Sequence, residues 1–370
     1  MNGLHGIIFA NEERAGLQEL VGPRCSASIP FGGRYRAVDF ALSNMVNAGI
    51  TDVGLVTHGQ YQSLLDHVGT GKAWDLSRKR GGLSFLPPFN DSGSRGIMPY
   101  RGNVEALAAV RSYLDTIRQD HVVLADGDLV ANLPITEIFE EHMKTGADIT
   151  VVCGNDSFAI DDGTYFEMDG SHRITEVLVK MRNPRGYRGL DTFILSTKLL
   201  KELVDDCSGK DQYSWRRAVL QARKDTLHLH AYIWNGFAAQ IRSVQEYYDR
   251  SMQLLNPEIR ADLFTPKRPV LAKSADKASA YVGPEGHIGN SLVADGCRIE
   301  GTVENSILFS GVTVEAGAVV QGCILFRDSA IRKDAEVSYV IADKNVEILE
   351  RRRLMGYATH PVVIAKNSKV

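Results

Sequence analysis

The sequence lacks the features that would place it in a membrane, in a disulfide-rich scaffold or on nucleic acid. Its five cysteines are far apart and none forms a CxxC pair, so a disulfide framework or a zinc site is not expected, and a reducing cytoplasm fits best. No stretch approaches the roughly 18 apolar residues that a membrane span needs. The first residues have neither the basic region nor the apolar run of a signal peptide. A net charge of -3 gives no global field that would recruit nucleic acid or an acidic membrane.

The length and the apolar pattern predict two domains. The chain has 370 residues, and its 44% hydrophobic and 24% charged residues are ordinary for a globular protein. Up to residue 255, strand patterns alternate with helical ones. The predicted strands include 6–10, 53–56, 121–125 and 148–153, and the predicted helices include 35–48, 104–117 and 135–144. This alternation predicts an α/β, Rossmann-like domain with a mostly parallel sheet and helices on both faces. Ligands of such sheets bind beyond the carboxyl ends of the strands, so residues 11–30 and 126–128 are expected near the site.

The texture of the sequence changes after residue 255. A linker is predicted over residues 256–280, where prolines recur. Within residues 281–370, branched or aromatic apolar residues recur every six positions, as at Leu308, Val314, Val320 and Phe326, with glycine, asparagine or aspartate between them. A six-residue repeat is typical of a parallel β-helix. The alternative is a run of ordinary hairpins, but the asparagines and glycines do not mark two-residue turns between alternating strands.

Residues 31–44, FGGRYRAVDFALSN, resemble the signature of the ADP-glucose pyrophosphorylase (glucose-1-phosphate adenylyltransferase) family, which is FGGKYR, two apolar residues and DFxLSN. Residues 290–297, 300–306 and 340–345 resemble the family's β-helix, so the resemblance covers essentially the whole chain. It implies a nucleotidyltransferase domain followed by a left-handed β-helix. In glycogen biosynthesis, family members join ATP and glucose 1-phosphate into ADP-glucose and release pyrophosphate. That chemistry depends on positioning and on charge neutralisation by Mg²⁺ and basic groups.

The family's nucleotide-binding motifs are altered in this sequence. The glycine-rich loop after the first strand is ANEERAG at residues 10–16. Its two carboxylates, Glu12 and Glu13, would repel ATP phosphates by about 1 kcal/mol or more per close charge pair. The lysine that precedes the family's FGG motif is replaced by Ser26. A reshaped loop that binds nucleotide in another way stays open as an alternative.

The family's sugar and metal contacts are also changed. Glu105 stands at the aspartate position of the family's GTADA turn and is one methylene longer. Asp128 keeps the first metal-binding aspartate, whereas Gln240 replaces the second one and Arg242 adds a cation two residues later. An amide is a poor Mg²⁺ ligand beside a carboxylate, because hard cations prefer charged oxygen. The changes together predict lost or weak catalysis, with Mg²⁺ at a vestigial Asp128 site only if activity persists.

Three basic residues match positions that bind ligands in the family. Lys180 aligns with the lysine that holds the sugar phosphate, although its flanking residues differ from the family's. Arg24 and Arg36 match basic residues that bind phosphorylated effectors between the two domains. The resemblance therefore implies a substrate contact at Lys180 and a regulatory anion site at the two arginines. The alternatives are an exposed lysine at a strand end and structural arginines that pair with local carboxylates.

The pattern resembles the GlgD-type regulatory subunits of Gram-positive bacteria. The resemblance implies a cytoplasmic, allosteric subunit that joins a catalytic ADP-glucose pyrophosphorylase subunit in a mixed tetramer and forms homo-oligomers alone. No nucleic acid or membrane partner is expected. One alternative is an active nucleotidyltransferase with a remodelled loop. Another is an acyltransferase, which is disfavoured because the repeats over residues 281–350 offer only His287, at their very start, as a catalytic histidine.

Overall fold

The structure is a computed structural model that describes residues 3–11, 15–87, 100–155, 163–181, 185–273 and 276–370. Contacts within the chain group the residues into two units. The first unit comprises Met1–Glu13, Val38–Gln240 and Phe264–Leu271, and the second comprises Arg14–Ala37, Ile241–Leu263 and Ala272–Val370. Each unit combines several separate segments of the chain, so the predicted domain limits at residues 255 and 280 stay predictions.

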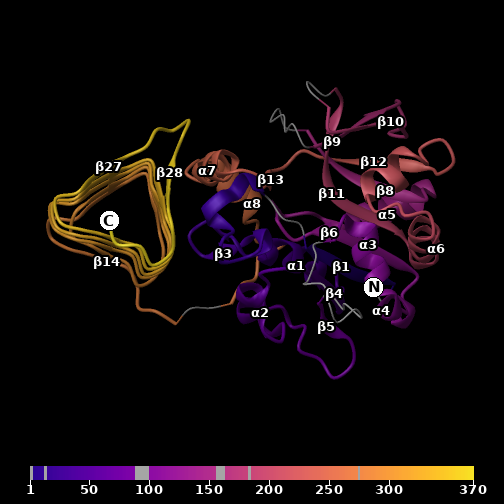
Figure 1. Cartoon of the computed structure of the whole chain (residues 1–370), viewed down its shortest axis with the longest axis horizontal. Coiled ribbons are helices and arrows are strands. Elements are labelled where there is room, and N and C mark those ends of the chain that lie inside the picture. Colours follow the sequence, from indigo (N-terminus) through magenta and orange to yellow (C-terminus); the bar gives the residue numbers. More distant parts are fainter. Residues whose placement is uncertain (1–2, 12–14, 88–99, 156–162, 182–184, 274–275) are drawn as a thin grey trace. The chain divides into compact units, whose positions relative to one another are not determined.

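The first unit contains a nine-stranded sheet (Figure 1). Its strands are β1 (Leu4–Ala10), β4 (Asp52–Thr57), β5 (Gly82–Leu86), β6 (His121–Asp126), β8 (Ile149–Gly154), β9 (Thr164–Met168), β10 (Ile174–Val179), β11 (Tyr187–Ser196) and β12 (Leu229–Trp234). The order is β10-β9-β11-β6-β1-β4-β5, and β8 pairs with β11 and β12. Strands β5, β4, β1 and β6 are parallel neighbours, whereas β11 is antiparallel to β6, β8 and β9. The predicted α/β fold is confirmed, and the antiparallel β11 makes the sheet mixed.

Strand β1 shows why this sheet needs helices on both sides. Every residue of β1 is buried. Ile7 and Phe9 belong to a core that also contains apolar residues of the helices α3 (Asn103–Ala109), α4 (Arg111–Thr116) and α6 (Thr197–Ser208). Successive side chains of a strand point to opposite faces, so Ile8, which has no exposed surface, packs on the other face. A strand buried on both faces is a nearly continuous apolar run, as the sequence of β1 is.

Helices surround the sheet. They are α1 (Ala37–Asn47), α2 (Gln62–Val68), α3 (Asn103–Ala109), α4 (Arg111–Thr116), α5 (Ile135–Thr145) and α6 (Thr197–Ser208), with the short helices η3 (Lys72–Trp74) and η4 (Trp215–Gln221). The single helix predicted over residues 104–117 is two helices, because Val110 leaves helical geometry with φ -107° and ψ 27°. A separate antiparallel pair joins β7 (Leu129–Ala131) to β13 (Ala238–Gln240).

The polar residues of the signature segment in α1 satisfy backbone and side-chain groups around them. Asn44 donates from Nδ2 to the carbonyl of Ala131 (2.9 Å) and accepts at Oδ1 from the amide of Leu133 (3.1 Å). Asp39 is fully buried and lies 2.6 Å from Nε2 of His67. This part of the signature therefore holds α1 against its neighbours.

The second unit contains the remaining elements. They begin with η1 (Ala15–Leu20), η2 (Ser26–Ser28), β2 (Pro30–Phe31), β3 (Tyr35–Arg36), α7 (Val244–Gln253) and α8 (Pro257–Leu263). Tyr247 of α7 donates from its hydroxyl to the carbonyl of Pro30 (2.8 Å), and its ring packs against Phe326 with centroids 6.2 Å apart. Tyr248 donates to the carbonyl of Gly322 (2.7 Å). Helix α7 is thus held between the β2 segment and the C-terminal repeats.

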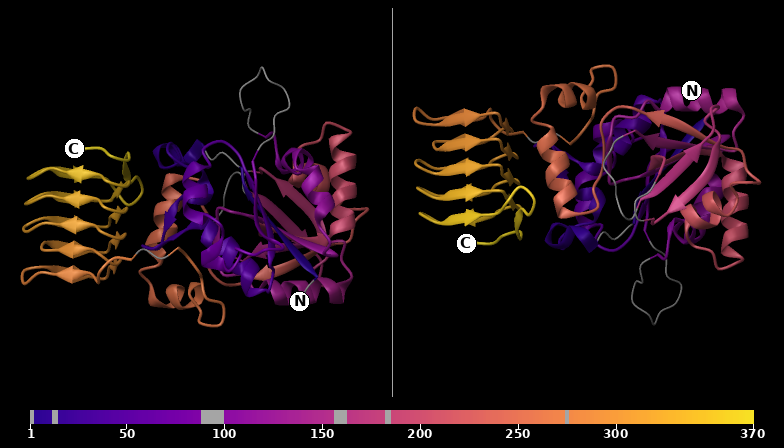
Figure 2. Two further views of the ribbon diagram at one scale, coloured as in Figure 1. Left: turned by 90° about the horizontal axis from the view of Figure 1, so that it is seen from below. Right: turned by 90° about the horizontal axis from the view of Figure 1, so that it is seen from above.

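Residues 281–364 form three stacked parallel sheets of five strands each, as Figure 2 shows. The strands are β14 (Tyr281–Val282), β15 (His287–Gly289), β16 (Leu292–Val293), β17 (Arg298–Ile299), β18 (Thr302–Glu304), β19 (Ile307–Leu308), β20 (Thr313–Val314), β21 (Val319–Gln321), β22 (Ile324–Leu325), β23 (Ala330–Ile331), β24 (Glu336–Ser338), β25 (Val340–Ala342), β26 (Glu347–Ile348), β27 (Arg353–Met355) and β28 (Val362–Ile364). Ile299, Val314, Ile331 and Ile348 pair in succession, and all four are fully buried. The predicted hexapeptide β-helix is confirmed.

The helices and the cysteines of the described residues bear on membrane insertion and on disulfide formation. Among the described residues, none of the helices has the length and apolar character required to cross a membrane. All five cysteines lie in the described part of the chain and are free thiols, four of them buried.

Candidate functional site

The first group of predicted site residues lies where parallel strands of the first unit end. Strands β1 and β6 are in register with Phe9 opposite Asp126, so both end at the same edge of the sheet. Asn11 follows β1, and its Nδ2 lies 3.4 Å from Oδ1 of Asn103 at the start of α3. Asp128 follows β6 and is almost fully buried. The altered loop residues Glu12 and Glu13 lie outside the described residues.

Gln240 lies beside Asp128 and is part of a buried polar cluster. Strand β13 places Gln240 opposite Leu129, the residue after Asp128. The Gln240 amide donates from Nε2 to Oδ2 of Asp191 at 2.8 Å. Arg216 binds the same carboxylate with two hydrogen bonds, at 3.0 Å to Oδ1 and 2.7 Å to Oδ2. A bidentate arginine together with an amide satisfies most of the hydrogen-bonding capacity of that carboxylate.

Sequence reasoning identified Gln240 but missed Asp191 and Arg216. Asp191 has φ +46° and lies in β11, where the register to β8 shifts between Gly189 and Phe193. Arg216 comes from η4, a short π-helical segment. Bulges and π-helical turns are frequent at functional sites, but neither has a short sequence motif that would have indicated this pair.

The resemblance implies a Mg²⁺ site with two aspartates, and the residues do not fit it. Gln240 offers a neutral amide whose Nε2 is already committed to Asp191. Its Oε1 is buried without a hydrogen-bond partner in the described part of the chain. The carboxylate that this amide contacts, Asp191, is held by the Arg216 guanidinium. Mg²⁺ needs an octahedral set of oxygens with carboxylates among them, and these contacts leave Asp128 as the carboxylate at this position.

The Glu105 carboxylate accepts hydrogen bonds from Arg101 at the start of α3. It lies in the first turn of α3, and both of its oxygens accept hydrogen bonds from Arg101: Oε2 from the backbone amide at 2.6 Å, and Oε1 from Nη2 at 2.7 Å and from Nε at 3.0 Å. Partial burial acts to raise the pKa of Glu105, but the hydrogen bonds from Arg101 outweigh it, so the pKa lies below the usual range. The Arg101 guanidinium also lies 3.4 Å from the centre of the Tyr213 ring.

Lys180 follows β10 and is exposed. It has φ +55°, and its backbone amide donates to the carbonyl of Gly163 at 3.1 Å. The structure therefore places this lysine on a surface turn of the first unit. Its predicted contact with a sugar phosphate stays a prediction.

Ser26, Arg24 and Arg36 all belong to the second unit. Ser26 is buried in η2. Arg24 forms a buried ion pair with Asp343, in which Nη2 lies 2.7 Å from Oδ1 and 2.8 Å from Oδ2. Arg24 also donates from Nη1 to the carbonyl of Leu20 at 3.1 Å. This arginine therefore has a carboxylate partner within the second unit, and its predicted role in anion binding stays a prediction.

Basic groups gather around this ion pair. Arg36 is half-buried and lies with Nη1 3.4 Å from Oγ of Ser28. Lys344 follows Asp343, and its backbone amide donates to Oδ1 of that aspartate. Burial, with the nearby charges of Arg36 and Arg24, lowers the pKa of Lys344 to about 7. Burial is the largest cause, because it disfavours the charged ammonium, and the two guanidinium groups add to it by repulsion.

Comparison with known proteins agrees with both parts of the fold. A nucleotidyl transferase family model matches residues 24–205, and a model of the GlmU-like C-terminal hexapeptide region matches residues 273–359. The glycogen biosynthesis protein GlgD of Bacillus subtilis (strain 168) is 33% identical over 371 residues, which is 99% of this chain and 96% of that protein. The chain belongs to the ADP-glucose pyrophosphorylase family.

Two names occur among the similar members of this family. The glycogen biosynthesis protein GlgD of Geobacillus stearothermophilus is 33% identical over 86% of this chain and 83% of that protein. A glucose-1-phosphate adenylyltransferase of the same organism is 30% identical over 85% of this chain and 82% of that protein. The chain is thus similar to proteins of both names to nearly the same degree.

Proposed function

We propose that this chain is a regulatory subunit of glucose-1-phosphate adenylyltransferase with little or no activity of its own. In glycogen biosynthesis it acts on a catalytic subunit that makes ADP-glucose and pyrophosphate from ATP and glucose 1-phosphate. The observation that carries the proposal is the Gln240 amide bound to Asp191, at the position where the family has a metal-binding aspartate. The name GlgD of two relatives agrees with it.

The physical reason is the charge needed by the reaction. Attack of glucose 1-phosphate on ATP, with pyrophosphate as the leaving group, builds negative charge on the phosphates, and Mg²⁺ held by carboxylates neutralises it. Here the carboxylates of Asp191 and Glu105 form ion pairs with Arg216 and Arg101. Gln240 carries no charge. Asp128 keeps the first of the family's two metal-binding carboxylates. One carboxylate with an amide binds Mg²⁺ more weakly than two carboxylates do.

A second candidate is an active adenylyltransferase with a reshaped nucleotide loop. Asp128 at the end of β6 and the adenylyltransferase name of a relative favour it. The two candidates differ in one measurement, which is the formation of ADP-glucose by the homogeneous chain without a partner.

The test is an assay of ADP-glucose formation with Mg²⁺, first with the purified chain and then with a catalytic subunit added. We expect no turnover from the chain alone, and a changed rate or substrate affinity of the catalytic subunit on mixing. The catalytic subunit alone at the same concentration is the control. Turnover of about 1–10³ s⁻¹ from the chain alone, the usual enzyme range, would replace this proposal with the second candidate.

The proposed partner is the catalytic subunit, in a mixed tetramer within the cytoplasm. The end rungs of the β-helix support association, because their strands leave backbone groups that another chain can cover. Large apolar side chains are exposed there: Tyr281 and Val282 in the first rung, and Met355 and Tyr357 at the last. Co-expression and size-exclusion chromatography test the complex. Separate elution at micromolar concentrations, together with unchanged kinetics on mixing, would exclude it.

The proposed regulation uses a phosphorylated small-molecule effector at the basic cluster around Asp343. Arg24 and Arg36 bring two guanidinium groups to this cluster, and a bound phosphate would favour the protonated form of Lys344 beside them. In the mixed complex, Arg36→Ala and Lys344→Ala should each weaken the effector response. An allosteric coupling of about 1–3 kcal/mol corresponds to a 5- to 150-fold change in apparent affinity. Lys333→Ala, which removes an exposed lysine of the same unit, is the control, and an unchanged response in both test variants would rule the site out.

A further inference from the structure

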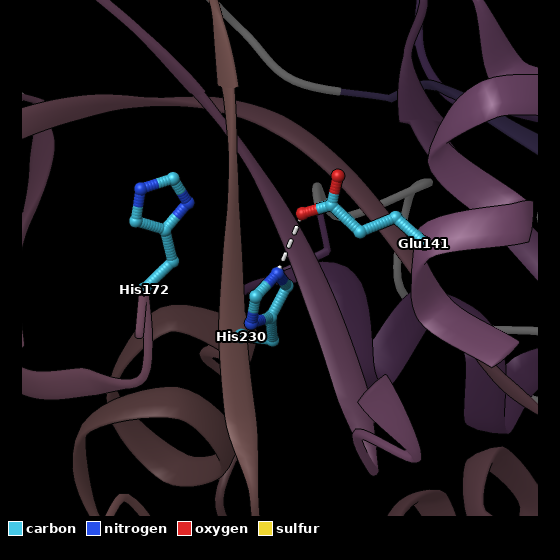
Figure 3. Close-up of side chains that lie close together, drawn as sticks. All are labelled: Glu141, His172 and His230. Carbon is cyan, nitrogen blue, oxygen red and sulfur yellow. Dashed lines mark hydrogen bonds and ion pairs between the residues drawn. The ribbon is translucent and has the colours of Figure 1, made fainter. Parts of the chain in front are cut away.

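Three metal-ligating side chains from separate elements of the first unit lie together (Figure 3). Glu141 comes from α5, His230 from β12, and His172 from the turn between β9 and β10. Their ligand atoms all lie within 4.8 Å of one another. Glu141 extends from its helix toward His230, and its Oε1 lies 2.7 Å from Nε2 of that ring (Figure 3).

The turn that carries His172 is built rigidly. Oδ1 of Asp169 accepts hydrogen bonds from the amide (2.8 Å) and hydroxyl (2.7 Å) of Ser171 and from the amide of Arg173 (3.1 Å). His172 itself has φ +62°, a left-handed conformation that non-glycine residues seldom adopt. Its carbonyl accepts from the amide of Ala231 in β12 at 2.9 Å. Backbone hydrogen bonds therefore hold His172 next to the strand of His230.

The surroundings favour a cation. The three side chains line a depression of about 460 Å³, together with Glu137, Glu140 and Lys144. That lining has three carboxylates against one ammonium group. The His230 side chain is only 5% exposed, whereas Glu141 is 34% exposed and His172 is open to solvent. A ligand entering from solvent would therefore meet His172 and Glu141 first.

The donor atoms are close to the geometry of a transition-metal site. Zinc binds histidine nitrogen at about 2.0–2.1 Å and carboxylate oxygen at about 2.0–2.2 Å, so tetrahedral donors lie roughly 3.3 Å apart. To bind the ion, the 2.7 Å distance between Glu141 Oε1 and His230 Nε2 has to lengthen slightly, and the ligand-atom distances of up to 4.8 Å within the group have to shorten. Rotation of the side-chain ends can make both changes. Two imidazoles and a carboxylate suit Zn²⁺ or a similar ion, and not Mg²⁺, which prefers oxygen.

We propose that Glu141, His172 and His230 bind a divalent transition-metal ion of the Zn²⁺ type, with a fourth coordination position left for water. The alternative is that Glu141 and His230 form a hydrogen-bonded pair that binds no metal, with His172 exposed beside them. None of the three ligands is a cysteine, so the cysteine spacing that argued against a zinc site in the sequence does not bear on this one. The site is independent of the proposed regulatory function.

The test measures metal binding by the full-length chain after treatment with a chelator. Titration with Zn²⁺ against a chromophoric chelator should give one ion per chain. Co²⁺ should give the visible absorption bands of tetrahedral coordination, and a large excess of Mg²⁺ should not displace it. His172→Ala and Glu141→Gln should each weaken Zn²⁺ binding at least tenfold and abolish the Co²⁺ bands. Both positions are partly or fully exposed, so neither change should unfold the chain, which circular dichroism checks.

The matched control is His287→Ala, which removes an exposed histidine of β15 in the other unit and should leave binding unchanged. The absence of stoichiometric Zn²⁺ binding would show that Glu141 and His230 are only a hydrogen-bonded pair. Binding that survives His172→Ala at full strength would place the ion elsewhere. Either result overturns the proposal.

Discussion

Removal of the Asp343 carboxylate should destabilise the second unit strongly. Arg24 and Asp343 are 2% and 1% exposed, and two hydrogen bonds join them. Asp343→Ala leaves a buried guanidinium without its counter-charge, which typically costs about 3–5 kcal/mol. The change also removes the acceptor of the Lys344 amide. We therefore expect a loss near the upper part of that range.

The pair can be separated from its packing with two further variants. A double change, Arg24→Met with Asp343→Leu, removes both charges and should restore most of the stability, because apolar replacement of a buried pair is often neutral or better. Glu336→Ala breaks an ion pair with Arg353 in which both side chains are exposed, at 48% and 77%, and should cost about 0–1 kcal/mol.

The assay is urea unfolding followed by far-ultraviolet circular dichroism. The chain's three tryptophans, Trp74, Trp215 and Trp234, all belong to the first unit, so their fluorescence reports on that unit separately. Hydrogen exchange of peptides around residues 20–30 and 340–346 locates the loss. The reasoning is refuted if Asp343→Ala costs less than about 1 kcal/mol, as the exposed pair does.

Three further outcomes are expected. Because burial lowers the pKa of Lys344 to about 7, acetic anhydride at pH 8 should label Lys344 faster than Lys333. Between about pH 7 and 10.5, Lys344 is neutral in the folded chain and charged in the unfolded chain, so its contribution to the free energy of unfolding rises with pH. Lys344→Met should flatten that rise. Val320→Ala in the β-helix core should cost about 2 kcal/mol in urea unfolding, whereas the 39% exposed neighbour Val319→Ala should change stability by about 0.5 kcal/mol or less. Ser243 caps α7 through a 3.1 Å hydrogen bond from a backbone amide, and Ser243→Ala should lower the free energy of unfolding by about 1 kcal/mol. Equal losses for the two valine variants, or no loss for Ser243→Ala, would contradict these expectations.

Much of the fold could be predicted because its signals are local. In the β-helix an apolar position recurs roughly every six residues, and each repeat builds one strand of a rung. Strand β1 is a short apolar run, which is typical of a strand buried on both faces. The break at Val110 could not be predicted, because the apolar spacing continues across it at Leu107 and Leu114. The antiparallel direction of β11 depends on pairing with distant strands and has no local signal.

The candidate site was predictable only where a motif carried it. The family motif predicts Gln240 at the second metal-ligand position, and in the structure strand β13 pairs Gln240 with Leu129, the residue after Asp128. Its partner Asp191 lies 49 residues away in sequence, and Arg216 comes from a helix without a signature. His172 lies in a turn whose shape depends on side-chain hydrogen bonds. Such groups come together through tertiary structure, which spacing along the chain does not encode.

The altered catalytic positions are paired with other groups of the chain, and this has a consequence for attempts to restore activity. Gln240→Asp would put a second carboxylate where the amide now donates to Asp191 at 2.8 Å. At an effective dielectric constant near 20, two charges about 4 Å apart repel by about 4 kcal/mol, and Arg216 offsets only part of this. The single change should therefore destabilise the first unit in urea unfolding followed by tryptophan fluorescence, and should not restore ADP-glucose formation. Adding Asp191→Asn should recover stability, whereas Gln212→Asp, at an exposed position, should have little effect. If Gln240→Asp alone is as stable as the unchanged chain, the Asp191 cluster does not constrain this position, and the charge argument against Mg²⁺ binding fails with it.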